Sequence, residues 1–74
     1  MKVEHLVIMA NDIGRFFGSE PEPADAVAGV LNHLQKFWDP RMQRQIVEHL
    51  QTGGAGLQEP ARSAVSALEE ALAS

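Results

Sequence analysis

The chain has 74 residues, no cysteine and a net charge of −4, with six Lys and Arg against ten Asp and Glu. This length predicts a single helical domain, 1–74, and the missing cysteines exclude disulfides and thiolate metal sites. An acidic balance without a basic stripe argues against nucleic-acid binding, because phosphate contacts supply most of that affinity. The N-terminal apolar run is short and interrupted, and no stretch approaches the roughly 18 apolar residues of a membrane span. We therefore expect a cytoplasmic protein that binds neither nucleic acid nor membrane.

The first two predicted elements are helices with broad apolar surfaces. The first runs from about Val3 to Phe17 and stops at Gly18, a residue type common at helix C-termini. The second runs from about Pro23 to Phe37, and proline suits its first position. Apolar residues cover about half of each helix, whereas a stripe of about 100° suffices to face a core. The excess indicates either an interface with a partner or central packing between the other helices.

The third predicted helix begins within FWDPRM, residues 37–42, which contains the only Trp of the chain. Asp39 is placed to cap this helix, and Pro40 suits its first turn. We expect Trp38 to be buried at the corner between two helices. Because Trp38 and Met42 lie four residues apart, we also expect Trp38 to pack back onto the new helix as a hydrophobic staple.

The third helix extends to about Gln51, where the glycines of TGGAG favour a flexible connection with positive φ angles. The fourth begins near Glu59-Pro60 and continues to the C-terminus, with Arg62 on its polar face. Asn11 and Asp12 interrupt the apolar first helix, and we expect them at the surface. No sustained period-2 alternation indicates a strand. The sequence therefore predicts an all-α fold, a small bundle of about four short helices.

The corner has two possible functional uses beside a purely structural one. Trp and Arg are enriched in interface hot spots, so the first use is docking on a partner. Arg41 lies beside the free amides of a helix start, so the second is that Arg41 and Arg44 bind an anion. Pairing of Arg44 with Glu48 one turn later is the structural alternative. The predicted partner-binding residues are Phe16, Phe17, Phe37, Trp38, Asp39, Pro40, Arg41 and Met42.

No pattern in the sequence predicts catalysis or metal binding. His5, His33 and His49 lie on three different predicted helices, without the close spacing usual for zinc ligands. No hydrolase motif surrounds a serine, and GGAG is not followed by the Lys-Ser/Thr of a phosphate loop. We therefore predict no catalytic residue, no metal ligand and no cofactor in this chain.

Two strings, MANDIGRFF at residues 9–17 and FWDPRM at residues 37–42, resemble the delta subunit of soluble, NAD-dependent, molybdenum-containing formate dehydrogenases. The resemblance implies a non-catalytic accessory subunit that docks on the large molybdenum-containing subunit for assembly or stability. It also implies a parent complex that holds bis-molybdopterin guanine dinucleotide, iron–sulfur clusters, FMN and NAD.

Two other functions remain open beside the accessory subunit. One is a maturation factor that binds a guanine nucleotide or a molybdopterin dinucleotide phosphate at Arg41 and Arg44, where the third helix starts. The other is a homodimer, closed by the same apolar surface when the chain is isolated from its partner.

Overall fold

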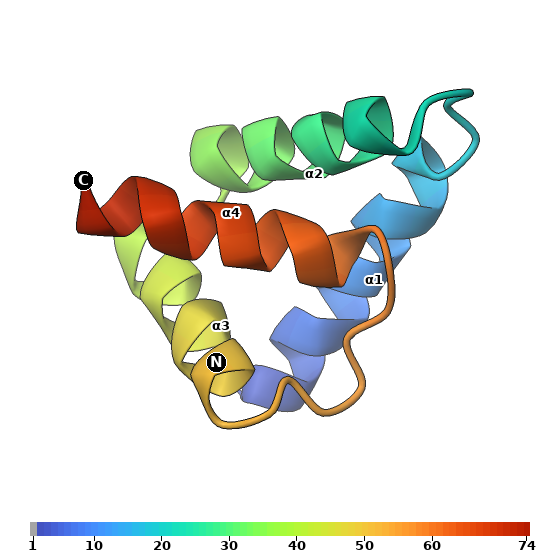
Figure 1. Ribbon diagram of the computed structural model, residues 1–74. Helices are drawn as coiled ribbons and strands as arrows, with labels where there is room; N and C mark the ends of the chain where they lie inside the picture. Colours follow the sequence, from blue (N-terminus) through green and yellow to red (C-terminus); the bar gives the residue numbers. More distant parts are fainter. Residues whose placement is uncertain (1) are drawn as a thin grey trace.

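The computed structural model describes residues 2–74, which form four α-helices and no strand (Figure 1). α1 spans Val3–Phe17, α2 spans Pro23–Phe37, α3 spans Pro40–Gln51 and α4 spans Ala61–Ala73. The predicted all-α bundle is confirmed. Pro60 occupies the N-cap position of α4, so that helix also begins where the sequence places it. None of the helices in this part of the chain has the length and apolar character that crossing a bilayer requires.

α1 and α4 each contact the other three helices, and α4 packs mainly against α2 and α3. Figure 1 shows α4 running beside α2, with α1 and α3 crossing below the pair. Every helix contributes to the interior, where the largest fully buried side chains are Leu6, Val30, Leu34, Ile46, Val65 and Leu68. Since α1 and α2 both pack against α4, central packing accounts for part of their broad apolar surface.

A second part of that apolar surface stays uncovered. Val27 and Leu31 of α2 are half-buried and pack against the core. Ile8, Phe16 and Phe37 are exposed on the surfaces of α1 and α2. Central packing therefore accounts for the half-buried side chains, and an interface stays a prediction for the exposed ones.

The glycine-rich loop between α3 and α4 has the predicted positive φ angles, at Gly53, Gly54 and Gly56. Side chains from three helices nevertheless bind this loop. Arg62, half-buried at the start of α4, donates hydrogen bonds to the carbonyl oxygens of Gly53 and Gly54, both at 3.2 Å. Nε2 of His49 lies 2.8 Å from another loop carbonyl oxygen. Arg62 therefore stabilises the loop. Its position on the polar face of the predicted helix does not indicate this role.

Asn11 fastens the same loop to α1. Its Nδ2 donates a hydrogen bond to the carbonyl oxygen of Gly56 at 2.8 Å, and its Oδ1 accepts one from the backbone N–H of Gln58 at 2.9 Å. Asp12 is exposed, as expected, whereas Asn11 is half-buried and bonded to the loop, so it is more than a surface residue. Asn11 satisfies two backbone groups of a loop that has no regular partner of its own.

Candidate docking site

The corner between α2 and α3 begins with a capped helix. Oδ1 of Asp39 accepts a hydrogen bond from the backbone N–H of Met42 at 2.9 Å. Pro40 occupies the first helical turn, where its missing N–H leaves no hydrogen bond unmade. The predicted start of the third helix is thus confirmed, together with its cap.

Trp38 is buried, with 5% of its surface exposed, and belongs to the hydrophobic core. Counted from the Asp39 cap, however, the fourth helical residue is Gln43 and not Met42, so the predicted staple was assigned to the wrong residue. The buried Gln43 side chain donates from Nε2 to the carbonyl oxygens of Trp38, at 2.7 Å, and Leu34, at 3.2 Å. The Gln43 amide therefore binds two carbonyl oxygens at the end of α2, and the Trp38 ring packs in the core.

Arg41 and Arg44 are exposed on α3. In residues 2–74 neither makes a salt bridge, and the ion pair that does occur joins Arg15 to Asp12 on α1. The pairing of Arg44 with Glu48 is therefore not formed. The Asp39 carboxylate already binds an amide at the α3 N-terminus and places a negative charge there, which opposes an anion at the same position. Anion binding by the two arginines stays a prediction.

A second feature of the site is a group of aromatic rings at the surface of α1 and α2. Phe16 is 76% exposed and Phe37 is 71% exposed. Phe16 meets Phe17 edge to face, with ring centroids 5.0 Å apart. One turn apart on α2, the rings of His33 and Phe37 lie 4.7 Å apart. Each exposed phenylalanine therefore has an aromatic neighbour that restricts its ring.

Between these rings lies a groove of about 210 Å³. We call it the aromatic groove, and its lining residues are Phe17, Gly29, Asn32, His33, Lys36 and Phe37. Phe17 comes from the end of α1 and the other residues from α2, so the groove exists only when the two helices pack. None of its lining residues is acidic, although the chain as a whole has a net charge of −4.

A family model described as the NADH-dependent formate dehydrogenase delta subunit, FdsD, matches residues 5–65. The chain belongs to this family. The match confirms the resemblance inferred from the two strings, and it includes all of α2 and α3 and most of α1. No curated protein and no solved structure matches the chain.

The matched region of this FdsD-family chain contains every residue predicted to bind a partner, but the structure divides them between two settings. Phe16, Phe17 and Phe37 gather at and beside the aromatic groove. Trp38 lies in the core and Met42 is half-buried against it, so a partner meets little of either side chain. Asp39, Pro40 and Arg41 are exposed at the start of α3. Partner binding by these residues is a prediction for which the groove supplies a specific surface.

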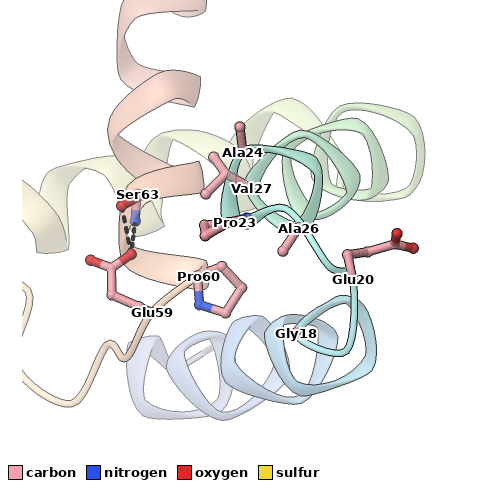
Figure 2. Close-up of a pocket in the computed structure, with 9 residues that line it drawn as sticks. All are labelled: Gly18, Glu20, Pro23, Ala24, Ala26, Val27, Glu59, Pro60 and Ser63. Atoms are coloured by element: carbon pink, nitrogen blue, oxygen red, sulfur yellow. Dashed lines mark hydrogen bonds between the residues drawn. The ribbon is translucent and has the colours of Figure 1, made fainter.

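A larger hollow, of about 410 Å³, lies between the end of α1, the start of α2 and Pro60 (Figure 2). One carboxylate oxygen of Glu59 in its wall accepts hydrogen bonds from the backbone N–H of Ser63 at 3.2 Å and from its hydroxyl at 2.5 Å. Figure 2 shows Glu20 directed away from Pro60. Over residues 2–74, no three His, Asp or Glu side chains are grouped closely enough to hold a metal ion. This hollow of the FdsD-family chain therefore offers mainly apolar surface with two carboxylates in its lining, Glu20 and Glu59, and Glu59 already binds Ser63 in the first turn of α4.

Proposed function

We propose that this chain is a non-catalytic accessory subunit of an NAD-dependent formate dehydrogenase. It docks on the large, molybdenum-containing subunit and supports the assembly or stability of the complex. The observation on which this rests is the family match over residues 5–65. The exposed rings of Phe16 and Phe37, on well-formed helices, support docking because large uncovered apolar side chains mark interfaces.

In this proposal the chemistry of the complex belongs to its other subunits. They hold bis-molybdopterin guanine dinucleotide, the iron–sulfur clusters and FMN, and they bind NAD. The delta subunit contributes a binding surface. Because it binds the folded form of another subunit and not the unfolded form, it stabilises that folded form by mass action.

The test is co-expression of the tagged chain with the remaining formate dehydrogenase subunits. We expect the chain to be recovered in stoichiometric amounts with the molybdenum-containing subunit, identified by mass spectrometry and by its metal content. We also expect the complex made without the chain to lose its subunits or its activity faster on dilution and heating.

Two results would overturn the proposal. One is the absence of any formate dehydrogenase subunit from the material recovered with the chain. The other is a complex that assembles in the same yield, and inactivates at the same rate, whether or not the chain is present.

A further inference from the structure

The aromatic groove is present in the chain without a partner, and packing of the core does not account for the position of Phe37 in its lining. Phe37 is 71% exposed, so its ring contributes little to the core. It lies against His33 at a centroid distance of 4.7 Å, and such an aromatic contact favours this position of the ring. A wall that is ordered before binding loses less conformational entropy when a partner arrives.

Gly29 lines the groove directly beside the Phe17 ring. A Cβ atom at this position would lie 2.4 Å from the Phe17 ring, a distance that no real side chain tolerates. Glycine inside a helix destabilises it by about 0.5–1 kcal/mol relative to alanine. At position 29, however, the absence of a side chain allows Phe17 to lie directly against α2. The position of Phe17 thus depends on a residue with no side chain.

The size of the groove favours a side chain as its occupant. Its volume of about 210 Å³ is below the range of about 300–1,000 Å³ that is typical of pockets for small molecules. An apolar side chain fits a hollow of this size, whereas a nucleotide or dinucleotide cofactor does not. The size therefore favours a side chain of a protein partner as the occupant.

The positive charge of Lys36 in the lining indicates which group of the partner lies beside its apolar side chain. Lys36 lines the groove, is exposed, and makes no salt bridge in the described part of the chain. Asn32 and His33 are the other polar residues of the lining. Charges across an interface are arranged to be complementary, so a free ammonium group without nearby acidic lining favours a partner with a carboxylate.

We propose that the aromatic groove is the part of this chain that docks, and that its occupant is an amphipathic segment of the formate dehydrogenase subunit to which the chain binds. An apolar side chain of that segment enters between Phe17 and Phe37, and a carboxylate beside it pairs with Lys36. This inference rests on the proposed function, because it takes the partner to be a subunit of that enzyme.

The experiment measures the affinity of the full chain for a formate dehydrogenase complex prepared without it and immobilised on a sensor. Phe37→Ala should weaken binding roughly tenfold or more, as truncation of an aromatic anchor does. Lys36→Glu should weaken binding more than Lys36→Gln, because reversal of the charge adds repulsion from the partner carboxylate. Raising the salt concentration should reduce the difference between the two Lys36 variants and leave the Phe37→Ala effect in place.

Two matched controls separate the groove from the rest of the surface. Ile8→Ala removes another exposed apolar side chain, 58% exposed on α1 and outside the groove. Lys2→Glu reverses an exposed cation at the start of α1 that is also without a salt bridge in the described residues and outside the groove. Both should bind within about twofold of the unmodified chain, as expected for residues outside the hot spot. Thermal unfolding of each variant verifies that the fold is retained.

The outcomes distinguish this inference from the proposed function. If the unmodified chain binds but the Phe37 and Lys36 variants bind equally well, the groove is not the docking site, while the accessory function stands. If the unmodified chain binds no formate dehydrogenase subunit, both fail. If Phe37→Ala instead abolishes self-association of the isolated chain, seen by light scattering, and leaves the complex intact, the occupant is a second copy and the inference is wrong.

Discussion

Phe37 and Trp38 are adjacent in the sequence, yet they belong to two different regions of the molecule. Phe37 is 71% exposed and forms a wall of the aromatic groove, whereas Trp38 is 5% exposed and lies in the core. The backbone explains the difference. Phe37 is the last residue of α2, and Trp38 follows it in an extended conformation, with φ −89° and ψ 133°.

The comparison separates the residues that build the corner from those that are available to a partner. Trp38, Asp39 and Gln43 make contacts within the chain: a core ring, a helix cap and a buried amide. Phe16 and Phe37 are mostly exposed, so their large side chains contribute little to packing within the chain. Mutations in the first group should therefore change stability, and mutations in the second should change binding.

The largest expected effect is that of Trp38→Ala. Removing a buried aromatic side chain costs about 3–5 kcal/mol, and for a domain this small that approaches the whole free energy of unfolding. We expect the variant to be largely unfolded or to melt far below the unmodified chain in a thermal scan by circular dichroism. Phe37→Ala is the matched control and should change the free energy of unfolding by less than about 0.5 kcal/mol, as exposed substitutions do. Equal destabilisation by the two substitutions would contradict the comparison.

Gln43→Met comes next. The substitution keeps approximately the length of the side chain but removes the N–H groups that donate to the carbonyl oxygens of Trp38 and Leu34. The Leu34 oxygen keeps the backbone N–H of Trp38 as a donor, so the Trp38 oxygen is the one that loses its donor from Gln43. Such a loss costs about 1–3 kcal/mol, which chemical denaturation should detect. Gln35→Met, at an exposed position of α2, serves as the matched control. A Gln43 variant as stable as the unmodified chain would show that the corner does not depend on the amide.

The fold was predictable because its helix boundaries are encoded by neighbouring residues. Gly18 follows the last residue of α1, Pro23 is the first residue of α2, and Asp39 with Pro40 starts α3. Each of these signals acts within about one turn of the residue that provides it. Helical periodicity then identified which faces are apolar.

The site was less predictable because its contacts join distant segments. Asn11 binds loop residues 45 and 47 positions away, and nothing near it in the sequence indicates a partner. Gln43 is polar and lies on a helix, and its burial depends on how α3 meets the end of α2. The sequence groups Phe37 and Trp38 as partner-binding residues, but their exposure differs because the backbone leaves the helix at Trp38, where helical periodicity no longer applies.

Asp39→Ala should have a smaller effect than the two core substitutions. It removes the acceptor of the Met42 backbone N–H, and loss of an N-cap costs about 0.5–2 kcal/mol. Asp39→Asn retains an acceptor oxygen at the same position, so it should recover most of the lost stability. Denaturant titration of both variants measures the difference. If Asp39→Asn is as unstable as Asp39→Ala, the negative charge beside the helix dipole, and not the hydrogen bond, stabilises this end of α3.

Arg41→Ala should have the smallest effect on stability, because the side chain is exposed and makes no salt bridge in residues 2–74. Its free energy of unfolding should change by less than about 0.5 kcal/mol. The informative measurement is its affinity for the formate dehydrogenase complex, compared with that of Phe37→Ala. A loss of affinity with unchanged stability would extend the docking surface from the aromatic groove across the corner to α3. An unchanged affinity would confine docking to the groove, and the corner would then serve only to hold Phe37 at the end of α2, where a partner reaches it.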